Sequence, residues 1–108
     1  MGTCVRLIVP TNNGNELVPI IGRIVGRFGG TTVTKGNGCW ASKQANGCVT
    51  RDAITVLDTS VPMWSPTIRQ WWVDLAEVVR EEWGQESVFL SIHEETAFLV
   101  ESDSVTTI

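Results

Sequence analysis

Two stretches with helical periodicity, one on either side of a long hairpin pattern, constrain the fold of this chain more than any other feature. In the first, apolar residues recur every three or four positions up to Phe28, and two glycines then end the run. Asn15 is a suitable N-cap and Pro19 is tolerated only in a first turn, so this helix should begin at or shortly after Asn15. In the second, Ser65 and Pro66 form a cap and first helical residue for an apolar stripe that continues to residue 83. We therefore expect two amphipathic helices.

Strand patterns flank both helices. The segment CVRLIVP is rich in β-branched residues and predicts a first strand that ends at Pro10. Residues 31–58 predict two strands joined at Asn46-Gly47, the dipeptide best suited to a tight type I′ turn. The segments SVFLSI and TAFLVE predict a fourth strand and a short fifth one, and the polar tail from about residue 102 is expected to fray.

This order of elements, β-α-β-β-α-β with a short extra strand at the C-terminus, predicts an α+β fold of the ferredoxin-like type. In that arrangement two helices cover one face of a four-stranded antiparallel sheet. A chain of 108 residues is long enough for one compact core, so residues 1–108 should form a single domain. The other sheet face would carry Ile8, Ile54, Val56 and Phe89, which is too apolar to stay in water. We therefore expect a homo-oligomer, a dimer or a trimer, with ligand clefts between subunits.

The composition argues against two classes of partner, nucleic acids and membranes. The formal net charge is −4 and the pI is about 4.8, which argues against nucleic-acid binding because phosphate neutralisation needs a basic surface. No run approaches the roughly 18 apolar residues of a membrane span, and the N-terminal segment is too short for a signal peptide. We expect a cytoplasmic protein, in the host cytoplasm if a phage encodes it, with no membrane partner.

The cysteines and the histidine do not indicate a metal site. Cys4, Cys39 and Cys48 are odd in number and lack the paired spacing of zinc ligands, so we expect reduced, partly buried thiols. His93 is the only histidine, and the IHEET context places it in an exposed turn. We expect neither a metal nor a cofactor.

Trp40 stands apart from the other four tryptophans, which lie within the second helix or at its ends. It comes after GNG, where absent side chains leave room over the backbone for a flat ligand. A two-residue turn at Asn46-Gly47 would pair Trp40 with Ala53 and so put Trp40 and Asp52 on opposite sheet faces. Arg51 would then share the Trp40 face and favour an anionic ligand, unless a bulge near GNGC reverses the faces.

Three segments carry a resemblance: RFGGTTVTKGNGCW, NGCVTRDAITVL and WGQESVFLSI. They resemble the pattern of a family of uncharacterised small bacterial and phage proteins, in which a GG-T-V strand leads to G-x-W, an acidic residue follows the hairpin, and G-Q-E-S-V precedes the last strand. The similarity covers residues 27–92. It implies a fold and no activity.

A more distant resemblance is to the phage S-adenosylmethionine lyases, small ferredoxin-like proteins that form trimers and bind their substrate between subunits. Their G-C-aromatic motif falls on Gly38 to Trp40, their acidic residue on Asp52, and their W-x-Q motif on Trp83 and Gln85. The aromatic residue is tryptophan here where the lyases have tyrosine, and Asp52 stands where they have glutamate. The resemblance implies a site made of these residues.

Three functional classes remain open from the sequence. The first is a phage-encoded oligomer that captures an adenine-containing ligand or signalling nucleotide as an anti-defence protein, with Trp40 stacking, Arg51 or Arg23 facing phosphate, and Gln85 beside polar groups. The second is a metal-independent S-adenosylmethionine lyase, in which Asp52 and Gln85 orient the substrate. The third is a structural or partner-binding protein.

The candidate site residues are accordingly few. For ligand binding they are Trp40, Arg51, Asp52, Gln85 and Glu86, and for catalysis they are Asp52 and Gln85.

Overall fold

A computed structural model gives the fold. It describes residues 2–10, 17–41, 49–84, 88–95, 98–100 and 105–107, with side chains over 2–10, 17–39, 51–84 and 88–93. The strands are β1 (Gly2–Pro10), β2 (Thr32–Ala41), β3 (Val49–Val61), β4 (Phe89–Glu95), β5 (Phe98–Val100) and β6 (Val105–Thr107), and the helices are α1 (Val18–Phe28) and α2 (Pro66–Glu82). The predicted element order is confirmed.

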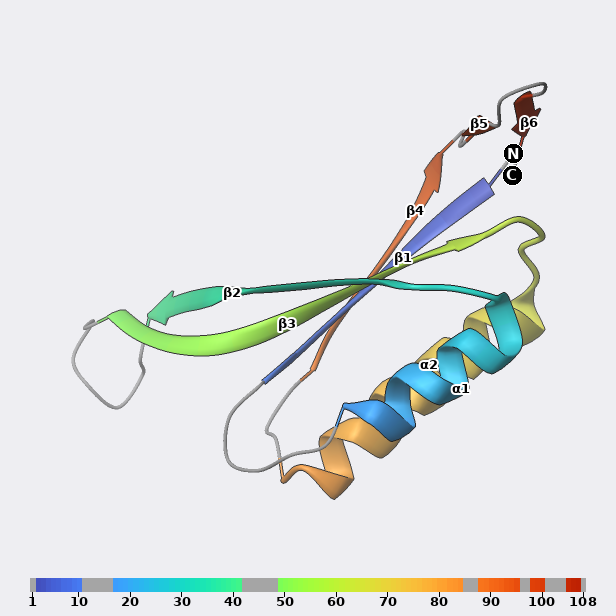
Figure 1. The fold of residues 1–108 in the computed structure, drawn as a ribbon. Coiled ribbons are helices and arrows are strands. Elements are labelled where there is room, and N and C mark those ends of the chain that lie inside the picture. The colour runs from blue at the N-terminus through green and yellow to red at the C-terminus, as the bar shows by residue number, and fades with distance from the viewer. Residues whose placement is uncertain are drawn as a thin grey trace.

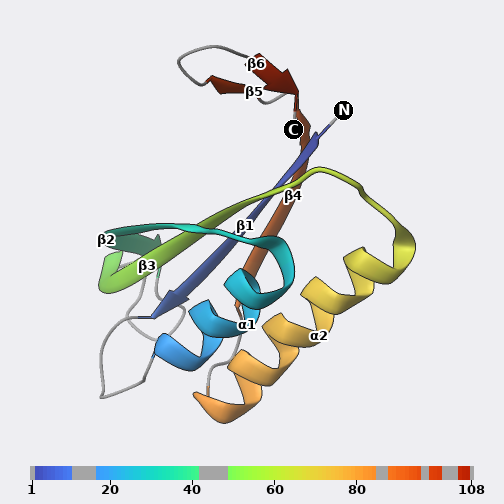
Figure 2. The ribbon, with the colours of Figure 1, turned by 45° about the vertical axis from the view of Figure 1, so that its right-hand side comes forward.

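One sheet contains the first four strands in the order β2-β3-β1-β4, and every neighbouring pair is antiparallel. Both helices lie side by side against the same face of this sheet (Figures 1 and 2). This is the α+β, ferredoxin-like arrangement that the sequence predicts. β5 and β6 pair with each other in a separate two-stranded sheet, so the tail that was expected to fray contains a second short strand.

The helix ends follow the local sequence signals. The Ser65 hydroxyl accepts a hydrogen bond from the Ile68 amide at 3.2 Å, which confirms the predicted cap of α2. Gly29 adopts φ 90° and ends α1, a conformation that glycine tolerates and other residues rarely adopt. The N-cap position of α1 is Leu17, which makes no side-chain cap hydrogen bond, and the predicted cap Asn15 lies outside the described residues.

The core lies between the helices and the sheet face that they cover. Each of its side chains contributes roughly 1.5–3 kcal/mol through burial. Its members are Val5, Leu7, Val9, Ile20, Ile24, Leu57, Val61, Trp72, Leu75 and Val79. Phe28 joins the helices because its ring stacks on Trp72 at 5.2 Å and meets the edge of Trp71 at 5.0 Å. Trp72 is fully buried, as its helical spacing predicts.

The opposite sheet face, here called the uncovered face, carries no helix. The register places Val56, Ile8 and Phe89 side by side on β3, β1 and β4, with Ile54 next to them along β3. Phe89 is 58 % exposed, so apolar surface lies open to water in the single chain. The apolar strip expected on this face is therefore present.

His93 is a correction to the sequence prediction. It lies within β4 on the uncovered face, opposite Cys4 of β1, and not in a turn. Its side chain is exposed, as expected, and its Nε2 atom is hydrogen-bonded to the Ser91 hydroxyl. The strand pattern extends three residues beyond SVFLSI because β4 continues to pair with β1 as far as Glu95.

Candidate functional site

The register of the β2–β3 hairpin decides which candidate residues share a face. Trp40 pairs with Thr50, and Gly38 pairs with Asp52. The predicted two-residue turn would have paired Trp40 with Ala53, so that register is wrong. The described pairing ends at Ala41 and Val49, and the residues between them lie outside the described part of the chain.

The observed register reverses the predicted faces. Directly paired strand residues lie on one face and alternate residues follow them, so positions 38, 40 and 52 belong to the uncovered face. Arg51 pairs with Cys39 and belongs to the other face. The predictions that Trp40 and Asp52 face opposite ways and that Arg51 shares the face of Trp40 are both wrong, and no bulge is needed to bring positions 40 and 52 together.

The end of the hairpin extends beyond the rest of the sheet. Pairing of β1 with β3 ends at Pro10 and Ile54, so residues 37–41 and 49–53 pair only with each other among the described strands. Figure 1 shows this pair of strands continuing past the helices. We call these residues the hairpin arm. A two-stranded ribbon is marginally stable by itself, so the arm is expected to gain stability from a further surface.

The arm presents a carboxylate opposite one glycine, and a second glycine lies just before the arm on the same face. Asp52 is half-buried and lies opposite Gly38, which is buried, and Arg51 is exposed. Gly36 lies two residues before Gly38 on the same face, opposite Ile54. A Cβ atom added to Gly36 would meet nothing within 4 Å, and its backbone needs no positive φ. Neither packing nor conformation within the chain therefore requires glycine at position 36.

Other sequence candidates are not placed by the structure. The side chain of Trp40 and the whole of Gln85 and Glu86 lie outside the described residues. Arg23, the alternative phosphate partner, is exposed on α1 and so lies on the helix side of the sheet. Neither Arg23 nor Arg51 belongs to the face of Asp52.

A second polar group on the uncovered face was not predicted. Arg6 of β1 binds Asp58 of β3 through two hydrogen bonds, at 2.8 and 3.1 Å. This carboxylate raises the pKa of Arg6 above its usual value, so Arg6 stays charged. Ser91 lies on the other side of Arg6 and binds His93. These residues come together through the pairing of β1 with β3 and β4. The pattern of one strand does not show which residues of the other strands lie next to it.

The charged groups of the uncovered face therefore lie on either side of the apolar strip. At one end Arg6 and Asp58 neutralise each other, the apolar strip occupies the middle, and Asp52 lies at the arm end. Asp52 is a carboxylate on this face, whereas neither of the two arginines that the sequence assigned to phosphate belongs to it.

Two hollows in the described part of the chain lie away from the arm. One is lined by residues near the end of α1, the end of β3 and the start of α2, and the other by residues 28–32, 58, 60 and 62. Neither includes a candidate residue from the sequence.

The described part of the chain shows no metal-binding group, no disulfide and no membrane-spanning helix. No group of three or more His, Cys, Asp or Glu side chains there is arranged to hold a metal ion. Cys4 and Cys39 form no disulfide, and Cys48 is outside the described residues. None of the described helices has the length and hydrophobicity needed to span a bilayer.

The fold defines the chain as an α+β protein of ferredoxin-like type with one open sheet face. Among solved structures, it is similar to a phage S-adenosylmethionine lyase in complex with S-methyl-5′-thioadenosine, with a TM-score of 0.62 and 18 % identity over 99 % of this chain and 88 % of that chain. A phage S-adenosylmethionine lyase in the apo state gives a TM-score of 0.60, with the same identity and coverage. No protein-family model and no curated protein sequence matches the chain. At this identity the similarity establishes the shared fold.

Proposed function

We propose that this protein binds S-adenosylmethionine on the uncovered face at the hairpin arm and cleaves it as a lyase. The observation that carries the proposal is the hairpin register, which puts Asp52 beside Gly38 on that face and Arg51 on the other. The fold shared with two phage lyase structures supports it, one of them bound to S-methyl-5′-thioadenosine.

The charge arrangement favours a cationic substrate. S-Adenosylmethionine carries a sulfonium and an ammonium group, and Asp52 supplies a carboxylate on the proposed binding face. The competing hypothesis of nucleotide capture needs a cation for the phosphates. Its two candidates, Arg51 and Arg23, lie away from the Asp52 face, so that hypothesis loses its proposed phosphate contacts.

The reaction needs no group from outside the substrate. The substrate carboxylate attacks its own γ-carbon, a carbon–oxygen bond forms, and the carbon–sulfur bond breaks with its electron pair passing to sulfur. The products are homoserine lactone and S-methyl-5′-thioadenosine, and the ammonium group keeps its proton. The protein has to hold the substrate in the folded conformation that brings oxygen and carbon together.

In this proposal Asp52 binds the ammonium group of the substrate and not the sulfonium. The sulfonium loses its charge in the transition state, so a carboxylate next to it would stabilise the ground state more and slow the step. The ammonium keeps its charge throughout, and an ion pair with it would bind substrate and transition state alike. Asp52 would then fix one end of the substrate while the adenine lies over the glycine positions of β2, where the sequence assigns Trp40 to stacking.

A second copy of the chain would complete the site. The apolar strip of the uncovered face and the two-stranded arm both lack a covering element among the described residues. Contact between copies across this face would cover both and form a cleft between subunits. We therefore place the site between subunits of a dimer or trimer.

The test is a product assay with purified protein and S-adenosylmethionine. We expect homoserine lactone and S-methyl-5′-thioadenosine to form in equal amounts. Asp52→Asn should raise KM at least tenfold with a smaller change in kcat, since it removes binding common to both states. Asp74→Asn is the matched control, because this exposed carboxylate on α2 binds only Gln70 in the described structure. Absence of both products at saturating substrate would refute the lyase proposal.

Capture without cleavage is a second candidate, favoured by one specific feature. Asp52 is shorter than the glutamate that the lyases have, and a shorter side chain would hold the ligand ends too far apart for the lactone to close. That protein would bind S-adenosylmethionine and return it intact. A rise in Tm with added S-adenosylmethionine, without product, distinguishes this candidate from the lyase, and no rise at all leaves the structural or partner-binding class.

A further inference from the structure

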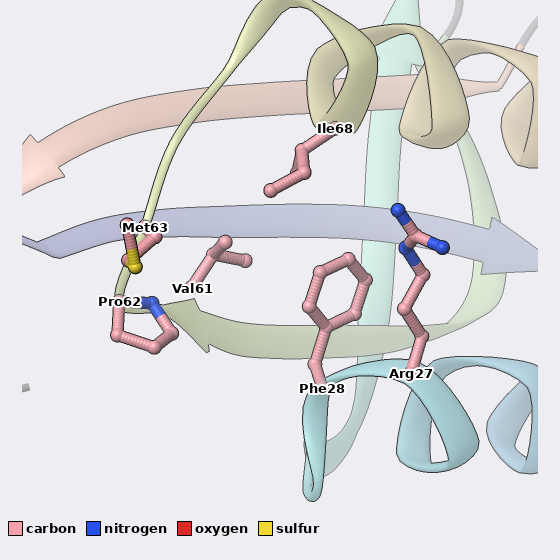
Figure 3. A pocket seen from close by; sticks show the side chains of 6 residues that line it. All are labelled: Arg27, Phe28, Val61, Pro62, Met63 and Ile68. Carbon is pink, nitrogen blue, oxygen red and sulfur yellow. The ribbon is translucent and has the colours of Figure 1, made fainter.

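A hollow of about 390 Å³ lies at the end of the helical layer, where α1 ends and α2 begins. Side chains from α1, from the end of β3 and from the first turn of α2 surround it (Figure 3). Its lining residues are Arg27, Phe28, Val61, Pro62, Met63 and Ile68. This volume falls within the range typical of small-molecule sites, and we call it the Arg27 hollow.

The lining combines an apolar surface with one positive charge. Five of its six residues are apolar, and no carboxylate is among them. Met63 is 79 % exposed and adds a flexible apolar side chain to the lining. The adjoining hollow shares Phe28 and Pro62 and includes Asp58, but Arg6 already holds that carboxylate. The charge facing the Arg27 hollow is therefore that of a guanidinium.

Arg27 is held in place without an ion pair. Its guanidinium carbon lies 5.8 Å from the centre of the Trp71 ring and 5.9 Å from that of Phe28. Two aromatic faces thus position the cation at the wall of the hollow. Arg6 and Arg80 each bind a carboxylate, whereas Arg27 has no carboxylate within ion-pair distance among the described residues. Its remaining donors can serve an anion from outside the chain.

We propose that the Arg27 hollow binds a small amphipathic carboxylate, an apolar chain or ring that carries one negative head group. The apolar part would lie against Phe28, Val61 and Ile68, and the carboxylate would face Arg27. The planar guanidinium can bind such a carboxylate through two parallel hydrogen bonds.

This site is distinct from the proposed lyase site. Val61 is nine residues from Asp52 along β3, which is about 30 Å at roughly 3.3 Å per residue. The hollow also lies on the helix side of the sheet. Its occupation can therefore be measured with no reference to S-adenosylmethionine.

Methionine methyl groups provide a direct assay. The chain has two methionines, Met1 and Met63, so methyl-¹³C labelling gives one reporter in the hollow and one at the N-terminus. Decanoate, titrated below its micelle concentration, should shift the Met63 signal saturably and leave the Met1 signal in place. Decyltrimethylammonium has the same chain and the opposite charge, and it should bind at least roughly fivefold more weakly.

Two matched variants test the role of the charge. Arg27→Ala should weaken decanoate binding roughly fivefold. Arg23→Ala should leave it unchanged, because Arg23 lies one turn earlier in the same Gly-Arg context, is exposed, and does not line the hollow. The proposal is overturned if decanoate does not shift Met63 at millimolar concentration, or if the two amphiphiles bind the unaltered protein equally. Equal decanoate affinity of Arg27→Ala and the unaltered protein would also overturn it.

Discussion

Gly36 offers the sharpest test of the proposed ligand site, because stability and binding should change in opposite directions. It lies inside β2 on the uncovered face, opposite Ile54, and an added Cβ would have open space around it. Glycine in a strand interior costs roughly 0.5–1 kcal/mol relative to alanine, and valine suits a strand better still. Gly36→Val should also gain a cross-strand contact with Ile54.

The expected changes in stability and in ligand affinity can both be estimated from this geometry. We expect the free energy of unfolding to rise by about 1 kcal/mol, and Tm to rise by about 4–8 °C. A flat ring stacked on the backbone sits at a contact distance of roughly 3.5–4.0 Å. The valine methyl groups fill that space, so affinity for S-adenosylmethionine should fall at least tenfold.

Three measurements make the test decisive. They are thermal unfolding, calorimetric titration with S-adenosylmethionine, and sedimentation to follow the subunit number. Ala53→Val is the control, because Ala53 is exposed on the other face of the neighbouring strand and should gain stability without losing affinity. If Gly36→Val keeps its affinity within about twofold, no ligand lies over this backbone. If it loses affinity together with its oligomeric state, a partner chain lies there.

Two further predictions concern the core and the uncovered face. The Thr55 hydroxyl is buried without a hydrogen-bond partner, whereas the Thr59 hydroxyl lies 3.0 Å from that of Thr31. In urea unfolding, Thr55→Val should raise the free energy of unfolding by about 1 kcal/mol and Thr59→Val should lower it by a similar amount, and a change of the same sign in both would contradict this. Phe89 is 58 % exposed on the uncovered face, so Phe89→Asp should leave the fold intact and separate the oligomer into monomers in sedimentation. An unchanged mass, or a monomer before substitution, would show that copies do not meet there.

The elements of the fold follow from local signals that the sequence carries. Helix α2 begins after Ser65 because the hydroxyl caps the chain at that point, and α1 ends at Gly29 because glycine accepts the left-handed conformation. The placement of Val56 and Ile8 on the open face follows from alternation within each strand. Such signals act over a few residues, so a single sequence reveals them.

Register across the hairpin could not be obtained in this way. Asn46-Gly47 favours a two-residue turn, yet the observed register pairs Ala41 with Val49. Pairing at a distance is decided by which faces bury their side chains against the helices, and Leu57 and Thr59 must both face the core. The observed register differs from the predicted one by three residues, and an odd shift moves every residue of β3 to the other face relative to β2. Asp52 and not Arg51 therefore shares the face of position 40.

The hairpin arm links this register to function. Its strands continue beyond β1, so Trp40, Arg51 and Asp52 occupy a part of the sheet that pairs with no third strand among the described residues. A ribbon of this kind would be shortened if stability of the single chain were the only requirement, because its ordering costs entropy and two strands alone are marginally stable. Its length is explained if the arm reaches a neighbouring copy and forms one wall of a shared cleft. Ligand binding and subunit contact should then stabilise each other, and S-adenosylmethionine should raise Tm more at protein concentrations where the oligomer partly dissociates.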